Sequence, residues 1–259
     1  MATKGLKKSL NHPIIPWLVP VGFLLIWQFL SQIGWLSNRV LPPPTDVIQA
    51  AITLTLSGEL FKHILISTQR AIAGFIVGGI IGVSLGLLNG ISFRAEKFLD
   101  TSLQMIRNIP HLALIPLVIL WFGIGEEAKL FLVSFGVFFP LYINTFYGIK
   151  TVDAGLIEMG KVYGLNSWGL FWQVILPGAL PSILVGVRYG LGIMWLTLIV
   201  AETIAANSGI GYMAMNAREF MRTDIVVLSI LMYALLGKLA DAIACGLEAK
   251  LLQWHPSYQ

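Results

Sequence analysis

The stretch EMGKVYGLNSWGLFWQVILPGALP, residues Glu158–Pro181, is a polar, glycine-containing insert between two long apolar runs. The rest of the chain is strongly apolar, since 56% of its 259 residues are hydrophobic and only 12% are charged. Soluble domains carry roughly 25% charged residues. The composition, with a mean hydropathy of +0.79, therefore predicts a polytopic membrane protein from which this insert projects.

The apolar runs on either side of the insert indicate how the chain crosses the bilayer. A helix needs about 20 apolar residues to cross a hydrocarbon layer about 30 Å thick. Six stretches have this length and composition: 17–36, 68–90, 98–122, 130–149, 178–201 and 225–247. Runs of this length satisfy their backbone groups in lipid as helices. We therefore expect an all-α, six-helix transmembrane bundle, a single domain over residues 1–259 with a cytoplasmic loop at 152–177.

Basic residues in the short loops predict which side each loop faces, because cytoplasmic loops carry an excess of Lys and Arg. An even number of spans puts both termini on one side. With the N-terminus inside, the inner ends and loops hold Lys4, Lys7, Lys8, Arg94, Lys97, Lys150, Lys161 and Lys250. The outer ends and loops hold Arg39, Lys62, Lys129, Arg218 and Arg222. This bias predicts a multi-pass protein whose termini and insert are cytoplasmic.

Small residues recur at every fourth position in two of the predicted spans. The second span carries Gly74, Gly78, Gly82, Gly86 and Gly90, and the fifth carries Gly178, Ser182, Gly186 and Gly190. Residues four apart lie on one face of a helix, and small residues there let a second backbone approach closely. Both stripes therefore predict tight helix packing.

Local signals predict how the insert folds. A short helix is expected first, with Asp153 near its start, where a carboxylate opposes the helix dipole. Gly164 suits the left-handed conformation that ends a helix, and either Asn166 or Ser167 suits the cap of a second short helix. Pro177 is expected to begin the next span. The tip would offer an apolar surface to a partner's groove or to the headgroup layer, formed by Val162, Tyr163, Leu165 and Trp168.

No complete motif for catalysis or metal binding occurs in the chain. The sequence GLIEMGKV approaches a phosphate-binding loop, but Val162 stands where Ser or Thr would bind magnesium, and no strand precedes it. The patterns His-Glu-x-x-His and Cys-x-x-Cys are absent. Ser208 lacks the flanking residues of a nucleophile elbow. We therefore expect a non-catalytic protein that holds no metal and no cofactor.

Charged residues inside the predicted spans are candidates for function, because burying one costs roughly 3 kcal/mol on insertion scales. Arg107 and Arg188 hint at an anionic species in a transport path, although each has the simpler alternative of pairing with a helix terminus or snorkelling. Arg70 lies near the end of a span and is expected to snorkel. Lys238 and Asp241 are spaced to form an ion pair.

The third predicted span contains the sequence RNIPHLALIP, residues 107–116. Pro110 and Pro116 each remove a backbone donor and are expected to bend the helix. Asn108 and His111 would then face a cavity, as broken helices do in transport paths. A merely kinked packing helix is the alternative.

The insert resembles the EAA loop of ABC-importer permeases, whose pattern is Glu-Ala-Ala, three residues, Gly, nine residues, Ile, one residue and Leu-Pro. This chain has Glu158, Met159, Gly160, Gly164, Val174, Leu176 and Pro177 at those positions. Met159, Gly160 and Val174 depart from the pattern, and Met159 is bulkier than alanine. The stretches RNIPHLALIPLVILWFGIGEEAK and MWLTLIVAETIAANSGIGYMAMNAREF are most similar to aliphatic-sulfonate permease subunits.

This resemblance implies the fold of a type I (MetI-like) ABC importer permease and a role in ATP-driven uptake of aliphatic sulfonates by alternating access. It implies a bacterial inner-membrane homodimer, two cytoplasmic ABC ATPase subunits that bind ATP and Mg, and a periplasmic or lipid-anchored substrate-binding protein. It assigns coupling to the ATPase to Glu158, Met159, Gly160, Gly164, Leu165, Leu176 and Pro177.

The resemblance leaves the substrate open among sulfonates, taurine, nitrate, bicarbonate and a thiamine precursor. A secondary transporter is the alternative of a different class, but it needs coupling ions and usually internal repeats. No convincing repeat relates residues 17–122 to 130–247. The polar segment Glu202–Phe220 is expected to form an outer loop that shapes the mouth of the path and receives the binding protein. The candidate path residues are Arg107, Asn108, His111, Arg188 and Glu202.

Overall fold

The computed structural model describes residues 15–254, and every regular element within that range is helical. The chain divides into two compact units. One contains the N-terminal residues up to Phe61 together with Met213–Leu231, and the other contains Lys62–Tyr212 and the residues from Met232 onward. The predicted all-α fold class is confirmed for the described residues.

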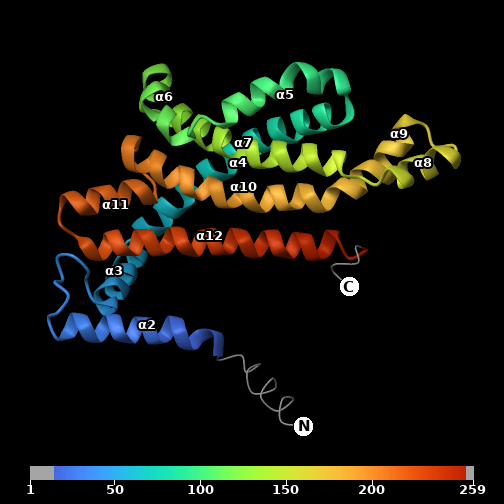
Figure 1. The fold of residues 1–259 in the computed structure, drawn as a ribbon. Coiled ribbons are helices and arrows are strands. Elements are labelled where there is room, and N and C mark those ends of the chain that lie inside the picture. The colour runs from blue at the N-terminus through green and yellow to red at the C-terminus, as the bar shows by residue number, and fades with distance from the viewer. Residues whose placement is uncertain (1–14, 255–259) are drawn as a thin grey trace, which may run out of the picture. The chain divides into compact units, whose positions relative to one another are not determined.

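The first unit is built from short helices and helix ends (Figure 1). They are α2 (Ile15–Gln32), α3 (Pro44–Leu56), most of α11 (Ile210–Glu219) and the N-terminal part of α12 (Thr223–Leu251). Pro44 begins α3, where its fixed φ fits a first turn and no hydrogen bond is lost. The Thr45 N–H donates to Gln28 Oε1 at 3.3 Å, which ties α3 to α2.

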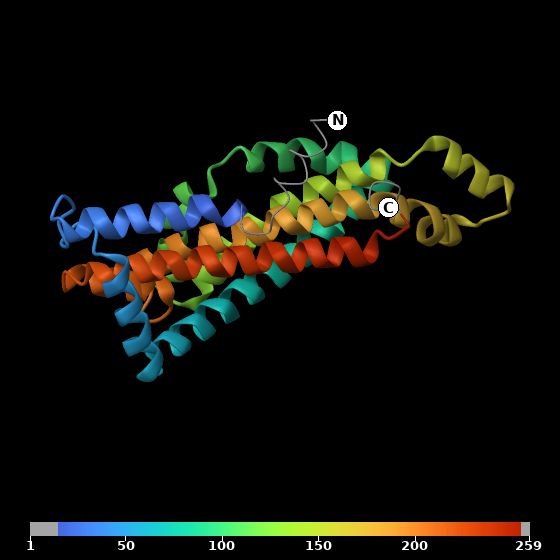
Figure 2. The same cartoon turned by 90° about the horizontal axis from the view of Figure 1, so that it is seen from below.

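The second unit holds the longer helices. They are α4 (Glu59–Ile91), α5 (Phe93–Arg107), α6 (Ile115–Phe122), α7 (Glu126–Lys150), α8 (Ala154–Val162), α9 (Ser167–Leu170), α10 (Leu176–Ala205) and the C-terminal part of α12. A 3-10 turn, His111–Leu114, precedes α6, and a π-helical turn, Phe171–Ile175, joins α9 to α10. α7 and α10 lie side by side, with α8 and α9 beyond one end of this pair (Figures 1 and 2).

Four helical stretches of the described chain are long and apolar enough to cross a membrane: Glu59–Ile91, Glu126–Lys150, Ser167–Ile204 and Thr223–Leu251. α5 and His111–Phe122 pass the same test only when taken together, and they are bent by 81°, as in a broken span or a re-entrant loop. The first predicted span corresponds to α2, whose apolar part, Leu18–Gln32, is shorter. A helix therefore lies at each predicted span, while the six crossings and the single transmembrane domain stay a prediction.

The third predicted span is broken as expected, but only one of its two prolines lies at the break. α5 ends at Arg107, and Pro110 has an extended backbone (φ −61°, ψ 112°) before the 3-10 turn. Pro116 instead occupies the first turn of α6, where its missing N–H costs no hydrogen bond. The prediction that Pro116 also bends the helix is therefore wrong.

The fifth predicted span begins earlier than expected. α10 itself begins at Leu176 with Pro177 in its first turn, as predicted, but α9, the π turn and α10 form one helical stretch, so no break separates the second short helix from the span. The Leu176 N–H donates to the Phe171 carbonyl five residues back. This wider turn directly precedes Pro177, which has no N–H to donate. The insert is therefore joined to the span by continuous helix.

Both predicted glycine stripes are confirmed as close-packing faces, and both pack on α7. A methyl group at Gly82 of α4 would lie 2.6 Å from the Phe138 carbonyl oxygen, and one at Gly186 of α10 would lie 3.0 Å from the Pro140 carbonyl oxygen. In the α10 stripe Ser182 takes the small-residue position between Gly178 and Gly186, and its hydroxyl donates to the Asn144 carbonyl at 2.8 Å. α7 is thus held at backbone contact by α4 and α10.

This packing predicts a large difference between two neighbouring glycines of α4. Gly82→Ala is expected to destabilise the chain by about 1–3 kcal/mol, because its methyl group would meet backbone that cannot give way. Gly79→Ala is the matched control, since its methyl group would lie 3.4 Å from the Leu141 side chain, an ordinary contact. Unfolding midpoints in detergent measure the difference, and equal midpoints would contradict the close approach of α4 to α7.

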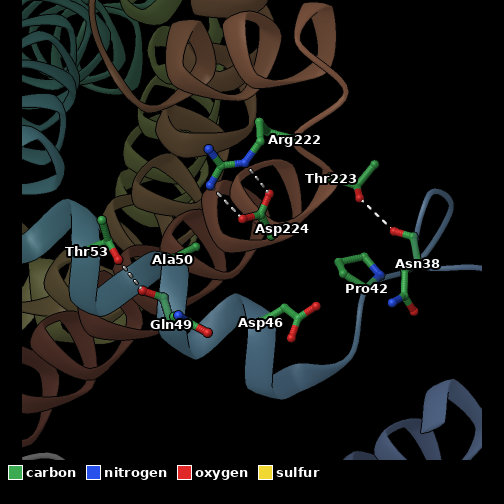
Figure 3. Close-up of a pocket in the computed structure, with 9 residues that line it drawn as sticks. All are labelled: Asn38, Pro42, Asp46, Gln49, Ala50, Thr53, Arg222, Thr223 and Asp224. Atoms are coloured by element: carbon green, nitrogen blue, oxygen red, sulfur yellow. Dashed lines mark hydrogen bonds and ion pairs between the residues drawn. The ribbon is translucent and has the colours of Figure 1, made fainter.

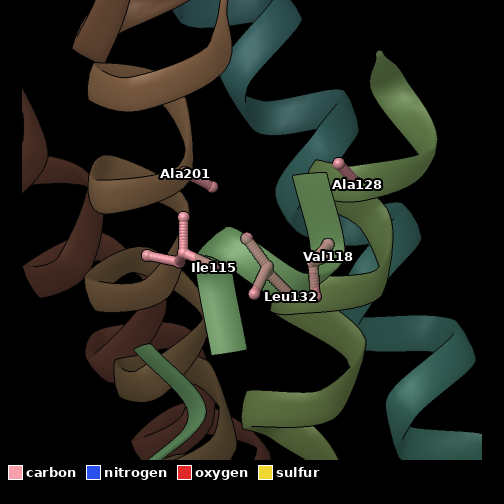
Figure 4. Close-up of a cluster of buried hydrophobic side chains, with 5 residues drawn as sticks. All are labelled: Ile115, Val118, Ala128, Leu132 and Ala201. Carbon is pink, nitrogen blue, oxygen red and sulfur yellow. The ribbon is translucent and has the colours of Figure 1, made fainter. Parts of the chain in front are cut away.

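A small apolar core fixes the broken span against the α7–α10 pair. It consists of five buried side chains from α6, α7 and α10, drawn in Figure 4: Ile115, Val118, Ala128, Leu132 and Ala201. Val118 is fully buried there. The cluster holds α6 in place and so fixes the position of the break that precedes it.

An apolar stripe on the C-terminal part of α12 faces away from the protein. Leu235, Leu239, Ile243 and Leu247 recur at every fourth position and are each exposed. Residues at this spacing share one face of the helix. A continuous exposed apolar face of this kind is typical of a helix surrounded by lipid or by another membrane helix.

Candidate functional site

The predicted helix–glycine–helix shape of the insert is confirmed. Asp153 begins α8 and accepts a hydrogen bond from the Gly155 N–H at 2.7 Å. Gly164 ends α8 with φ +82°, and the following Leu165 N–H donates to the Gly160 carbonyl at 3.0 Å. Of the two predicted caps for α9, the structure uses Asn166, whose Oδ1 accepts from the Gly169 N–H at 2.7 Å.

Gly160 has a packing role that fits the small residue of the EAA pattern. It is buried in the insert, and a methyl group there would lie 2.8 Å from Leu170 Cδ1 and 3.3 Å from Leu165 Cδ1. Val174 of the π turn closes the same contact. α8 therefore packs through Gly160 onto the helical stretch that leads into α10.

The tip of the insert exposes large apolar side chains, as predicted, with one correction. Val162 is 86% exposed, Tyr163 80% and Trp168 70%. Leu165, predicted to be part of this tip, is instead half-buried against Gly160 and Gly169. The exposed surface is thus formed by the end of α8 and the start of α9.

The remaining residues predicted to couple to the ATPase form two groups, an exposed pair on α8 and a half-buried pair where the π turn meets α10. Glu158 is exposed and makes no hydrogen bond or ion pair with the part of the chain that the structure describes. Met159 beside it is 49% exposed. Leu176 and Pro177 are half-buried at the junction of the π turn and α10. Glu158 and Met159 are therefore accessible at the surface of the insert.

Two of the predicted path residues line one cavity. Arg107 at the end of α5 and His111 at the start of the 3-10 turn flank the break, and both line a cavity of about 400 Å³ beside α7 and α10. Asn144 of α7 and Tyr189 of α10 complete its polar lining. Asn108 caps α5 but does not line the cavity.

Arg188 lies in a different setting. Its Nε donates to Asp241 at 2.7 Å, and the predicted Lys238–Asp241 ion pair is also present at 3.0 Å. Both pairs are exposed, and they border a second cavity of about 610 Å³ between α10 and α12. Arg188 is therefore paired with a carboxylate of α12 rather than with a helix terminus, and its place in a transport path stays a prediction.

Glu202 lies apart from both cavities, in a buried polar network. It is 1% exposed and belongs to α10, so the outer loop predicted to begin at Glu202 starts only after Ala205. Its carboxylate accepts hydrogen bonds from Ser67 Oγ at 2.8 Å, the Gly211 N–H at 2.9 Å and the Tyr233 hydroxyl at 2.9 Å. Three other segments of the second unit therefore converge on this carboxylate of α10.

Arg70 supplies the charge that balances Glu202, so the prediction that Arg70 snorkels is wrong. Its Nη1 lies 2.8 Å from Glu202 Oε1, and its Nε lies 2.6 Å from Glu126 Oε2. Arg70 also donates to the carbonyl and the hydroxyl of Ser208. The side chain is only 9% exposed.

The sequence NSGIG, residues 207–211, is explained by this network. Gly209 has φ +107° and packs directly on the Glu202 carboxylate, where any side chain would overlap it. The Ile210 N–H donates to Ser67 Oγ at 2.8 Å, so the Ser67 hydroxyl serves the loop and the carboxylate together. The sequence signal for this network was Glu202 near the end of a predicted span, followed within nine residues by Gly209 and Gly211.

The first unit contains a polar depression of about 370 Å³ (Figure 3). α3 contributes Asp46 and Thr53, and the start of α12 contributes the ion pair between Arg222 and Asp224 at 2.9 Å. Thr223 Oγ1 donates to the Asn38 carbonyl at 3.0 Å and fixes the loop before α3. None of the predicted site residues lines this depression.

An all-helical bundle with apolar spans, a broken span beside a cavity and a helix–glycine–helix insert defines a membrane transport component. The chain belongs to the family described as binding-protein-dependent transport system inner membrane component, whose model matches residues 74–253. It is therefore an inner-membrane component of a transport system with several membrane-spanning helices.

Three relatives cover most of the chain. The putative aliphatic sulfonates transport permease protein SsuC of Escherichia coli (strain K12) is 61% identical over 245 residues, 95% of this chain and 93% of that protein. The protein of the same name from Bacillus subtilis (strain 168) is 48% identical over 242 residues, 93% and 88% of the two chains. The taurine transport system permease protein TauC of Escherichia coli (strain K12) is 34% identical over 241 residues, 91% and 88%.

Solved structures of ABC transporters share the fold. An inward-facing MetNI methionine ABC transporter matches with a TM-score of 0.57 and 17% identity, over 72% of this chain and 95% of that chain. An amino acid ABC transporter with histidines matches with a TM-score of 0.55 and 16% identity, over 75% and 96%. The expected type I, MetI-like permease fold is confirmed.

Proposed function

We propose that this chain is the permease subunit of an ATP-driven importer that takes up aliphatic sulfonates by alternating access. The two relatives at 61% and 48% identity are both named as aliphatic sulfonates permeases, against 34% for the taurine permease. The observation that carries the importer role is the insert itself, a capped α8–Gly164–α9 elbow that exposes Val162, Tyr163 and Trp168. An exposed apolar tip of this kind marks a contact with a protein partner or with the headgroup layer, and the match to a family of transport-system components favours a partner.

The partners follow from this role. A second copy of the chain forms the other half of the transport path, and two cytoplasmic ABC ATPase subunits bind the two inserts. These ATPases hold ATP and Mg, so the permease itself is not an enzyme and binds no cofactor. A periplasmic or lipid-anchored binding protein delivers the sulfonate from outside and docks on the polar segment that follows Ala205 and ends at Phe220.

The insert has the construction of a lever. Closure of the ATPase pair moves the two tips together, and the continuous helix from Ser167 to Ile204 carries that motion into the membrane. A docked lever shifts an equilibrium only if its partner binds the two states with different affinity. Gly164 sets the elbow, Gly160 and Leu165 hold it together, and Leu176 and Pro177 join it to the span. Glu158 and Met159 are exposed and face the ATPase.

Orientation completes the proposal. The insert and both termini are cytoplasmic, as the distribution of basic residues favours. The basic residues of the N-terminus that contribute to this bias lie outside the described residues: Lys4, Lys7 and Lys8.

Copurification and growth test the proposal together. We expect the wild-type chain, expressed with its genomically adjacent ATPase, to purify as a complex that hydrolyses ATP in detergent and to support growth on alkanesulfonates as sole sulfur source. Tyr163→Asp with Trp168→Asp should abolish both, because it places charges in the apolar contact. Leu196→Asn, a control at an exposed position of α10 that lies outside the insert and beside the cavity between α10 and α12, should leave copurification intact.

The outcomes separate the alternatives. Uptake that needs an ion gradient and no ATPase would make the chain a secondary transporter. An ATPase complex that restores growth on taurine but not on alkanesulfonates would keep the permease role and overturn the substrate.

A further inference from the structure

The cavity beside the broken span is lined by one arginine, Arg107, by a few polar side chains and by an apolar wall. His111 marks one end, since its Nε2 lies 3.3 Å from Thr197 Oγ1, next to Gly136. Asn144 lies eight residues further along α7, and at 1.5 Å per residue this separates the two ends by about 12 Å. The wall between them includes Phe139, Ile143 and Ile193.

We propose that this cavity binds one alkanesulfonate molecule in the membrane domain itself, with Arg107 and His111 holding the sulfonate and the apolar wall holding the alkyl chain. The inference rests on the proposed function and extends it, because it gives the permease a share of the substrate selection. The cavity volume of about 400 Å³ falls within the range of roughly 300–1,000 Å³ that small-molecule sites occupy.

The charge of the cavity matches a singly charged head group. Arg107 makes no ion pair or hydrogen bond with other side chains of the described chain, whereas Arg70, Arg188 and Arg222 are each paired. No acidic residue belongs to the described lining. An unpaired guanidinium beside apolar helices favours an anion, and its planar donors suit an oxyanion in a two-pronged contact. One such cation balances one sulfonate.

His111 is held in place to contribute a second donor. Thr197 is fully buried on α10, and Gly136 allows it to approach, because a methyl group at Gly136 would lie 2.8 Å from Thr197 Oγ1. In the tautomer that we propose for sulfonate binding, the Thr197 hydroxyl donates to Nε2 and the proton of the neutral ring sits on Nδ1. That N–H has no partner among the described residues and can donate to a sulfonate oxygen.

The apolar wall makes the site selective by chain length. Each methylene that leaves water for an apolar surface improves binding by roughly fourfold, from the usual transfer free energy. A hydrated inorganic sulfate carries a second charge and has no chain to place on Phe139 and Ile143. The same wall would therefore favour longer alkanesulfonates and exclude sulfate.

The test uses the permease–ATPase complex in nanodiscs of phosphatidylcholine, without the binding protein. Titration calorimetry measures the binding of methane-, butane- and hexanesulfonate and of inorganic sulfate. We expect affinity to rise with chain length and sulfate to bind negligibly. Arg107→Gln should weaken butanesulfonate at least about tenfold, the usual effect of losing a charged hydrogen bond, and Arg94→Gln on the same helix should change nothing. Ile143→Thr should flatten the chain-length dependence.

The wild-type series needs no variant, so it decides the matter even where Arg107→Gln assembles poorly. Equal binding of all chain lengths, or full binding by a folded Arg107→Gln complex, would overturn the inference. Loss of sulfonate binding on adding phosphatidylglycerol would assign the cavity to a lipid headgroup and overturn it as well. If wild-type cells grow on alkanesulfonates but the complex binds none, the proposed function is kept and the cavity inference is overturned. If the cells do not grow on alkanesulfonates, both are overturned.

Discussion

Replacing Glu202 with alanine is expected to lower the free energy of unfolding by about 3–5 kcal/mol, the usual cost of removing one partner of a buried ion pair. The carboxylate is 1% exposed and faces Arg70, whose side chain is 9% exposed. Without it, Arg70 keeps only the solvent-exposed Glu126 as a charged partner. The Tyr233 hydroxyl and the Gly211 N–H also lose their acceptor.

The measurement is the unfolding midpoint of the full chain in detergent, followed by tryptophan fluorescence at a fixed heating rate because such unfolding is often irreversible. A loss of this size moves the midpoint by on the order of 10 °C in a chain of this length. Asp241→Asn is the matched control. It also removes a carboxylate that pairs with an arginine, Arg188, on a neighbouring helix, but this pair is exposed. Exposed pairs contribute little, so its midpoint should stay that of the wild type.

A double variant separates charge from packing. Arg70→Met with Glu202→Leu removes both charges and keeps apolar volume, and buried pairs replaced in this way are often neutral or stabilising. It should therefore unfold at a higher temperature than Glu202→Ala alone. A Glu202→Ala chain as stable as the wild type, or a double variant less stable than Glu202→Ala, would show that the buried charges do not hold the four segments together.

The insert could be predicted from the sequence because its structure is local. Asp153, Gly164 and Asn166 each act on backbone groups within three residues, and each has the conformation or hydrogen bond that its residue type favours. Leu165 was missed as an interior residue because its contact is with Gly160, across the elbow. A glycine that leaves room for a neighbour is visible only once the elbow is folded.

The Glu202 network was beyond sequence reasoning because its partners are far apart in the chain. Ser67 and Glu202 are separated by 135 residues, and Arg70 and Ser208 by 138. Arg70 lies near a predicted helix end, where snorkelling costs nothing. Only the packing of α4 beside α10 shows that a carboxylate is within reach.

The sequence predicts the positions of the candidate path residues only in part, for a similar reason, and their role in a path stays a prediction. The break at Pro110 is a local effect, and it brings Arg107 and His111 to one cavity. The ion pair of Arg188 could not be predicted, because its partner Asp241 lies on a different helix, α12. A lone arginine in a span has the same appearance in the sequence whether a carboxylate or a substrate neutralises it.

Gly164→Val is expected to reduce ATP-driven uptake at least about tenfold while the protein still inserts at normal levels. Gly164 has φ +82°, and a left-handed backbone costs an L-residue roughly 1–2 kcal/mol, most for a β-branched one. The relevant equilibrium is between an insert with the elbow angle that docks on the ATPase and an insert with another elbow angle. A difference of 1.4 kcal/mol changes the ratio of these two states tenfold. The spans are untouched, so membrane insertion should not change.

Gly164→Asn is the matched control, because asparagine adopts this conformation far more readily than valine does. No atom lies within 4 Å of a methyl group at Gly164, so both side chains fit the chain itself and differ in backbone preference. Uptake of labelled alkanesulfonate, with the amount of copurified ATPase, should rank the wild type first, Gly164→Asn close behind and Gly164→Val far below. If asparagine were as damaging as valine, the partner's surface rather than the elbow angle would require glycine. If neither variant affected uptake, the insert would not transmit force through this residue, and the lever would have to turn elsewhere.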